Sequence, residues 1–216
     1  MPPHPLLIAS LGNPGPRYAN TLHSAGHILL SALATHLHHP PFAPSSRLLA
    51  HALVSRASSP PYTLWQSPAY MNASGPQLAL AFRNWLASLP PGTSAAGGDG
   101  EGSDKGRGRV EAKLVILHDE LEAPLGRLKV RVGGASARGH RGVRSCVEAL
   151  RGVKGGEEGR VVRVGVGVGR CEGRGREEVA GWLLREMEGW EGRVLRGRAA
   201  ELEGVLGGIA EGRLGG

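Results

Sequence analysis

The sequence predicts one α/β domain built in three layers, in which a mixed, mostly parallel central sheet is flanked by helices. Three observations support this class: short apolar runs typical of buried strands, apolar residues at helical spacing, and the alternation of these two patterns along the chain. A length of 216 residues suits one domain with its own core, so residues 1–216 are expected to form a single domain.

The first elements are a strand, a turn and a helix. Leu6 to Leu11 is an apolar run that ends at Gly12-Asn13-Pro14-Gly15, which predicts a buried strand entering a tight turn. Apolar residues at helical spacing then predict a helix from about Leu22 to Leu37, with Thr21 or Asn20 as N-cap. The same patterns predict strands over 52–56, 62–66, 114–117, 128–132 and 161–169, and helices from Ser74, after His140, and over 177–188 and 191–206.

Residues 90–109 interrupt this alternation. Their sequence, PPGTSAAGGDGEGSDKGRGR, is of low complexity and offers almost nothing apolar to bury. We therefore expect a flexible insertion inside the domain rather than a boundary between two domains.

The net charge of +7 is unevenly distributed. Residues 1–90 contain four arginines and no acidic residue, whereas residues 123–170 contain eleven Arg or Lys and three Glu. This concentration of charge favours a polyanionic partner. A solvated basic surface, or a compositional bias towards arginine, is the alternative interpretation.

Few features of the sequence bear on the compartment. Cys146 and Cys171 form neither a disulfide framework nor a metal-binding pair, which favours a reducing compartment and no metal. No apolar run reaches the roughly 18 residues that a membrane span needs. The N-terminus lacks the basic region of a signal peptide, and the predicted structure begins by Leu6, so the cytoplasm is favoured over the mitochondrion.

Several polar residues lie at the ends of predicted elements. Asn13 follows the first strand, Met71-Asn72 follows the strand over 62–66, and Asp119 follows the strand over 114–117. His23 lies in the first turn of the first helix. Ligands of open α/β sheets gather beyond the carboxyl ends of the strands, so this topology permits the four segments to converge on one site.

Four segments carry a more specific signal. They are Leu11–Tyr18 with Thr21–Gly26, then Pro68–Gly75, then His118–Leu121 with Gly133–His140, and finally Val162–Gly167. In this order they resemble the motifs of bacterial-type peptidyl-tRNA hydrolases, and the resemblance covers roughly residues 6–190. It implies an enzyme that hydrolyses the ester between peptide and tRNA as a monomer, with peptidyl-tRNA as its partner and without cofactor or metal.

The resemblance also implies roles for individual residues. His23 would be the catalytic base and Asp119 its partner, while Asn13 and Asn72 would hold the peptide and the region of the ester. Met71 would line the peptide pocket, with a packed core methionine as the alternative, and Tyr18 would lie beside the cleft.

Elementary chemistry agrees with a histidine base. Ester hydrolysis needs an activated water, and an imidazole with a pKa near 6.5 is suited to accept its proton. The positive end of a helix would disfavour protonated His23, whereas a nearby Asp119 would favour it. The sequence leaves the sum of these two opposing effects open.

The basic residues are expected to contact tRNA. Lys129 and Arg131 share one face of a predicted strand, Arg163 matches a basic position of the fourth motif, and Arg138 lies in the glycine-rich turn. Arg141 departs from the family, which usually carries Asn at this position. Because arginine donates hydrogen bonds and cannot accept them, we expect Arg141 to bind the oxyanion or a phosphate, with slower catalysis and stronger electrostatic capture.

Two other functions are compatible with the sequence. One is a catalytically weak or inactive RNA-binding relative, similar to the plant organellar intron-splicing factors of the same superfamily. The other is an esterase for small acylated substrates, which would leave the basic residues unexplained.

Overall fold

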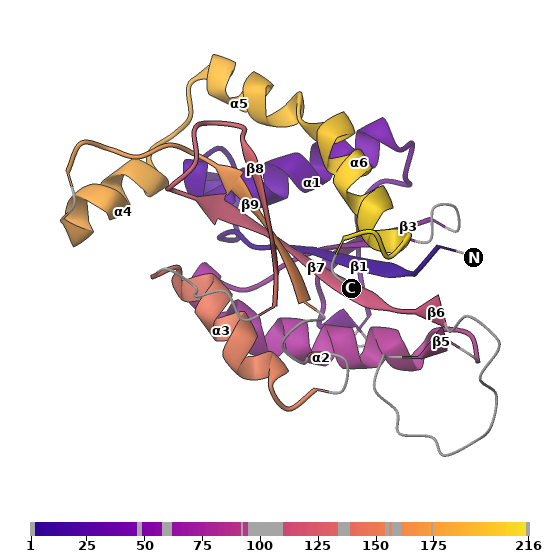
Figure 1. The fold of residues 1–216 in the computed structure, drawn as a ribbon. Coiled ribbons are helices and arrows are strands. Elements are labelled where there is room, and N and C mark those ends of the chain that lie inside the picture. The colour runs from indigo at the N-terminus through magenta and orange to yellow at the C-terminus, as the bar shows by residue number, and fades with distance from the viewer. Residues whose placement is uncertain are drawn as a thin grey trace.

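A seven-stranded sheet forms the centre of the structure, which is a computed structural model (Figure 1). It describes residues 3–46, 49–57, 62–91, 93–94, 110–133, 139–153, 156, 161–173 and 175–214. The strand order is β2-β3-β4-β1-β7-β9-β8. The four inner strands are parallel: β4 (Tyr62–Gln66), β1 (Leu6–Ser10), β7 (Lys113–Glu120) and β9 (Val161–Gly167). The antiparallel strands are β2 (Ala43–Pro44), β3 (Leu53–Arg56) and β8 (Leu128–Val132).

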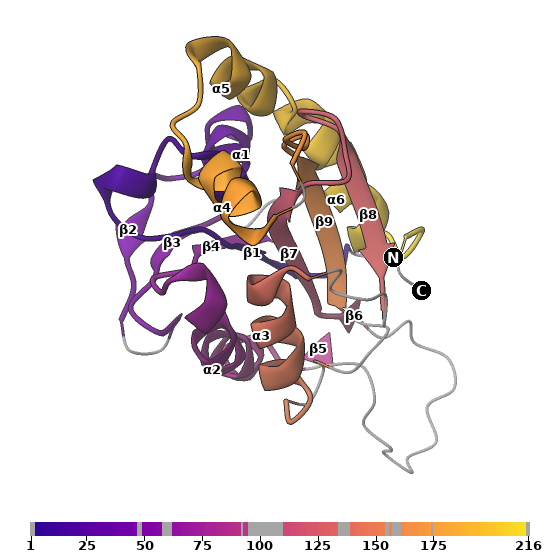
Figure 2. The same ribbon diagram turned by 90° about the vertical axis from the view of Figure 1, so that its left-hand side faces the viewer.

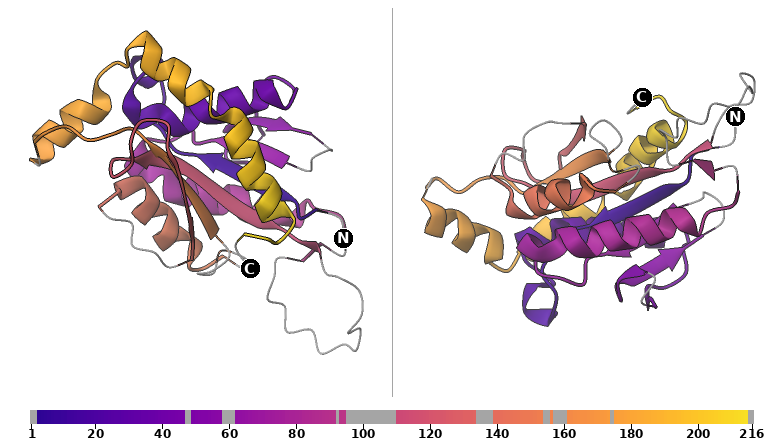
Figure 3. Two further views of the ribbon diagram at one scale, coloured as in Figure 1. Left: turned by 45° about the horizontal axis from the view of Figure 1, so that its top comes forward. Right: turned by 90° about the horizontal axis from the view of Figure 1, so that it is seen from below.

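Helices cover both faces of the sheet. One face carries α1 (Ala25–His36), α5 (Gly189–Arg196) and α6 (Ala199–Ala210), and the other carries α2 (Ser74–Ala87) and α3 (Arg141–Leu150), as Figures 1 and 3 show. The short helix α4 (Arg176–Leu184) stands in front of the carboxyl ends of the inner strands (Figure 2). Three 3₁₀ turns complete the site region: η1 (Pro16–Tyr18), η2 (Leu22–Ser24) and η4 (Met71–Ala73).

The inner strands are apolar because both of their faces are covered. Along β1, Leu6 and Ile8 join the core beneath α1, α5 and α6, whereas Leu7 and Ala9 join the core beneath α2 and α3. Successive side chains of a strand point to opposite faces, so the part of a strand that lies between two helical layers is mostly apolar on both faces. The predicted three-layer fold with a mixed, mostly parallel sheet is confirmed.

Several predicted elements differ in extent. The helix predicted over 177–188 runs over Arg176–Leu184, and the strand predicted over 161–169 ends at Gly167. The first helix begins at Ala25, because residues 22–24 form the separate turn η2, and the hydroxyl of Thr21 donates to the carbonyl of Tyr18 instead of capping the helix. The strand predicted over 114–117 continues to Glu120, so Asp119 lies within it. The helix predicted over 191–206 is two helices, since α5 ends at Arg196 and α6 begins at Ala199.

The predicted insertion is described only at its start. Thr93–Ser94 (β5) pairs in parallel with Val110–Glu111 (β6). Residue 92 and residues 95–109 lie outside the described residues. Within the described part of the chain, no helix has both the length and the apolar character needed to cross a bilayer.

Candidate active site

Asp119 is the charged centre of the site. It lies near the end of β7, with its side chain almost wholly buried, and its Oδ1 is 3.1 Å from Nδ1 of His23 and 2.9 Å from Nε2 of His140. Burial alone would raise the pKa of this carboxyl, but the two imidazoles hold the pKa far below its usual range. Asp119 is therefore a buried carboxylate anion at neutral pH.

A close approach between α1 and β7 positions His23 beside Asp119. A Cβ atom on Gly26 would lie 2.8 Å from the carbonyl oxygen of Leu117, so only glycine allows the start of α1 to pack against this strand. The hydroxyl of Ser24, in the same turn, donates to the carbonyl of Tyr18. These contacts place the η2 turn, which carries His23, against the end of β7.

The imidazole of His23 has one buried and one available nitrogen. Nδ1 is buried against Asp119, and the side chain as a whole is 17% exposed and lines a cavity. Burial lowers the pKa of His23, but the charge and hydrogen bonding of Asp119 outweigh it, so the pKa is raised. The sequence left open whether the pKa of His23 is raised or lowered, and the contact with Asp119 decides that it is raised. His23 belongs to a 3₁₀ turn that precedes α1, outside the α-helix whose positive end was expected to act on it.

His140 is a second partner of Asp119 that sequence reasoning did not single out. As the N-cap of α3, it accepts a hydrogen bond at Nδ1 from the backbone N–H of Val143, at 3.1 Å. Nε2 must then carry the proton that is donated to Asp119. Histidine is not among the usual N-cap residues, so this role has little signal in the sequence.

His118 lies beneath this cluster. Its Nδ1–H donates to the backbone carbonyl of Asp119 at 2.8 Å, and its ring meets that of His140 edge to face at 4.9 Å between centroids. Burial lowers the pKa of His118 to about 4, so this ring stays neutral at pH 7. The rings of His23, His118 and His140 all line the cavity, and the pKa of His23 is raised.

The two asparagines predicted for the site both reach it. The Oδ1 of Asn13 accepts a hydrogen bond from the backbone N–H of Met71 at 2.9 Å, which leaves its amide N–H groups to donate elsewhere. Asn72 is exposed and lines the same cavity, of about 680 Å³. Met71 lines this cavity and also packs in the core. Tyr18 contacts the cavity-lining Tyr70 edge to face, with 6.2 Å between ring centroids.

Arginines form one wall of the cavity, called here the arginine wall. Among the described residues, the arginines that line it are Arg131, Arg141, Arg163, Arg170 and Arg176. Arg163 is only 3% exposed and lies opposite Arg131, which forms an ion pair with Glu120. The Nζ of Lys129 donates to the carbonyl of Glu122 at 3.0 Å. Arg138 lies outside the described residues.

Helix α4 closes one side of the cavity. Val179, Ala180, Leu183 and Leu184 supply its apolar lining. The segment after α4 is tied to the turn before His23, because the N–H of Met187 donates to the carbonyl of Asn20 at 2.8 Å. In the described part of the chain, no three or more His, Cys, Asp or Glu residues are grouped as metal ligands.

Comparisons with known proteins agree on one family. The family model described as "Peptidyl-tRNA hydrolase" matches residues 7–90 and 108–210, and the gap falls inside the predicted insertion. A probable peptidyl-tRNA hydrolase of Schizosaccharomyces pombe is 33% identical over 189 residues, which cover 88% of this chain and 75% of the relative. The peptidyl-tRNA hydrolase of Mycolicibacterium vanbaalenii is 34% identical over 163 residues, which cover 76% of this chain and 70% of that relative.

A solved structure shares the fold. The crystal structure of peptidyl-tRNA hydrolase from Acinetobacter baumannii superposes with a TM-score of 0.70 at 22% identity, covering 99% of this chain and 92% of that one.

Proposed function

The chain belongs to the peptidyl-tRNA hydrolase family, and we infer that it hydrolyses the ester bond that joins a peptide to tRNA. One observation carries the mechanism that we propose for it. An imidazole with one nitrogen against a buried carboxylate and the other available to solvent lies in a cavity with an arginine wall. Such a group can take a proton from water beside a polyanionic substrate.

In the proposed reaction His23 is the general base. Its Nε2 accepts a proton from a water molecule while the water oxygen attacks the ester carbonyl carbon. Asp119 orients the ring and stabilises the imidazolium that forms. The carbon–oxygen bond to the ribose then breaks, and the ribose oxygen takes the proton back from His23.

Neutral amides are suited to hold the developing charge. The amide N–H groups of Asn13 are oriented by the bond from Met71, so they can donate to the oxyanion without titrating. We assign Asn72 and Met71 to contacts with the peptide, and Tyr18 to the rim of the cleft beside Tyr70.

The arginine wall supports a role in binding tRNA. Arg131, Arg141 and Arg163 face the space in which a ribose–phosphate chain would lie once the ester reached His23. We propose that they bind phosphates, with Lys129 and Arg138 contributing further along the same surface. Affinity for tRNA should therefore fall steeply as salt rises.

The RNA-binding alternative is not favoured, because the chain retains the arrangement of base, carboxylate and amides. The deciding assay incubates the protein with N-acylated aminoacyl-tRNA and follows release of the acyl group, in parallel with His23→Ala. Release by the wild type that is lost in the variant supports the proposal. Binding without release by either protein would instead support the RNA-binding function, and cleavage of simple esters without preference for tRNA would support the small-ester function.

We further propose that the enzyme acts as a monomer in the cytoplasm, with the mitochondrion as the alternative compartment. The mechanism uses no metal or cofactor. Sedimentation at micromolar concentration measures the oligomeric state, and fractionation of the source cells measures the compartment.

A further inference from the structure

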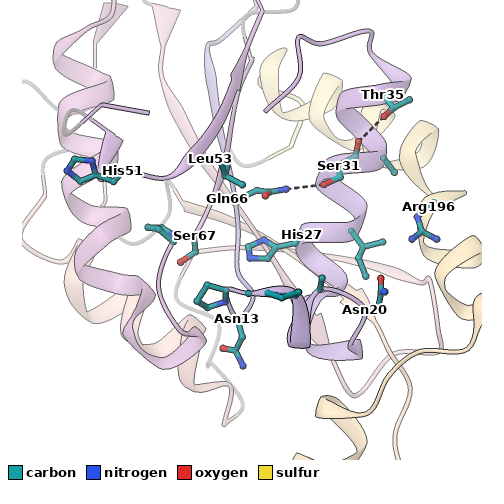
Figure 4. A pocket seen from close by; sticks show the side chains of 17 residues that line it. Asn13, Asn20, His27, Ser31, Thr35, His51, Leu53, Gln66, Ser67 and Arg196 are labelled. Carbon is teal, nitrogen blue, oxygen red and sulfur yellow. Dashed lines mark hydrogen bonds between the residues drawn. The ribbon is translucent and has the colours of Figure 1, made fainter. Parts of the chain in front are cut away.

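A second cavity, of about 640 Å³, lies on the other side of the turn that carries Asn13 (Figure 4). It opens between α1 and the strands β3 and β4, and its size is in the range of small-molecule sites. Gly12 makes room for the ring of His27, because a Cβ on Gly12 would lie 2.3 Å from Cδ2 of that ring. Figure 4 shows His27 in the middle of this pocket, between the side chains of α1 and those of β4.

The pocket offers uncharged hydrogen-bonding groups. Nδ1 of His27 is 2.7 Å from the hydroxyl of Ser10, and burial lowers the pKa of His27 to about 4, so the ring is neutral at pH 7. The amide nitrogen of Gln66 donates to the hydroxyl of Ser31 at 3.0 Å. Of the described residues that line the pocket, none is acidic and only Arg196 carries a fixed positive charge.

The second pocket borders the catalytic cavity directly. Asn13 lines both, and the turns on either side of the border are joined by its hydrogen bond to Met71 and by the contact between Tyr18 and Tyr70. A peptide that extended from His23 over these joined turns would reach the second pocket.

The two cavities differ in charge, because five arginines and the acidic residues Asp119, Glu120 and Glu122 line the catalytic cavity, whereas Arg196 carries the only fixed charge among the described residues that line the second pocket. This difference suggests where the two parts of the substrate lie. The arginine wall is built from β8, β9, α3 and the α4 segment, so the phosphates of the RNA belong on that side of His23. The acyl group of the same ester must then extend the other way, towards Asn13. Amide groups of a peptide need donors and acceptors without fixed charge, and His27, Gln66 and Ser31 supply them beside apolar prolines, Ile28 and Leu53.

We propose that this second pocket binds the peptide of peptidyl-tRNA, at the residues beyond the one esterified to the ribose. The inference rests on the proposed hydrolase function and adds a peptide subsite to it. Substrates with longer peptides gain these contacts, whereas a single N-acetylated amino acid ends before it reaches them.

The test compares a tetrapeptidyl-tRNA with an N-acetyl-aminoacyl-tRNA. Ser31→Trp fills the pocket from an exposed position of α1, and Gln66→Leu removes its amide at similar size. In both variants the ratio of kcat/KM for the long substrate over the short one should fall about tenfold, through KM for the long substrate. Ala200→Trp, on an exposed position of α6 that lines neither cavity, is the matched control and should keep the wild-type ratio.

Direct binding separates this inference from the hydrolase function. An N-acetylated tetrapeptide amide is titrated into wild type and into Ser31→Trp, which measures the pocket even if the protein cleaves neither substrate. Weaker binding to the variant supports the inference. The inference is overturned if the ratio of kcat/KM for the long substrate over the short one and the peptide affinity both stay unchanged in the variant. It is also overturned if the variant loses affinity only for deacylated tRNA ending in CCA. Failure of the wild type to release either acyl group contradicts the proposed function instead.

Discussion

Two regions line the same cavity. One is the corner where β1 and β7 end, which holds His23 and Asp119, and the other is the wall formed beside it by Arg131 of β8 and Arg163 of β9. The sequence predicted the corner better than it predicted the wall. At the corner, residues that follow predicted parallel strands did converge, since Asp119 lies 3.1 Å from His23. At the wall, two of the residues expected to contact tRNA are covered or paired, since Arg163 is 3% exposed and Arg131 forms an ion pair with Glu120. Strand order fixes where residues meet, whereas burial depends on which helices and loops cover them.

Removal of the charge at the corner should have the largest effect. Asp119→Asn keeps the size of the side chain but removes the anion that faces His23 and His140. We expect kcat/KM to fall by about 10²- to 10⁴-fold, the usual contribution of a positioned general base. Single-turnover release of N-acetylated amino acid measures this loss. A decrease of only twofold would show that the charge of Asp119 contributes little to catalysis.

The second prediction tests how the corner is assembled. Gly26→Ala puts a methyl group 2.8 Å from the carbonyl of Leu117, so α1 must shift and carry His23 with it. We expect a roughly 10²-fold lower kcat and about 1–3 kcal/mol less stability to urea. Gly204→Ala on α6, where a Cβ meets nothing within 4 Å, is the matched control and should be neutral or stabilising. Equal activity in the two variants would contradict the packing argument.

The third prediction concerns the wall. Arg163→Gln removes a charge from the cavity and should raise KM about tenfold while kcat changes little. The slope of log KM against log salt should become shallower by about one unit. The comparison is Arg83→Gln, an exposed position of α2 outside the cavity, for which KM and slope should stay near the wild-type values. Identical behaviour of the two variants would argue against a phosphate contact in the wall.

The smallest effect on the kinetics is expected for Arg141, which lies between the corner and the wall. Arg141 is the first residue of α3 and follows His140, the N-cap that donates to Asp119. Arg141→Asn restores an amide that can both donate and accept, so kcat should rise roughly fivefold while affinity for tRNA decreases. Steady-state kinetics at two salt concentrations measures both changes. An unchanged kcat in Arg141→Asn would show that Arg141 has no part in the catalytic step.

The fold was predictable because its inner strands are short apolar runs, each bounded by turns or glycine. The positions of His23 and Asp119 followed from the ends of those elements. The role of His140 was harder to foresee, because it depends on α3 bringing a helix cap to within 2.9 Å of a residue 21 positions earlier. The pocket around His27 depends on the space left by Gly12, and the spacing of apolar residues along the sequence does not predict such a space.

The buried carboxylate of Asp119 raises the pKa of His23, the base of the proposed reaction. A base must be unprotonated to act, so kcat/KM should fall as pH decreases through that pKa. The most direct measurement is the acid limb of kcat/KM in wild type and in Asp119→Asn. The wild-type midpoint should lie above 6.5, and the midpoint of the variant should lie at lower pH, because burial then acts on the imidazole without the Asp119 charge. The same midpoint in both proteins would show that Asp119 does not raise the pKa of His23.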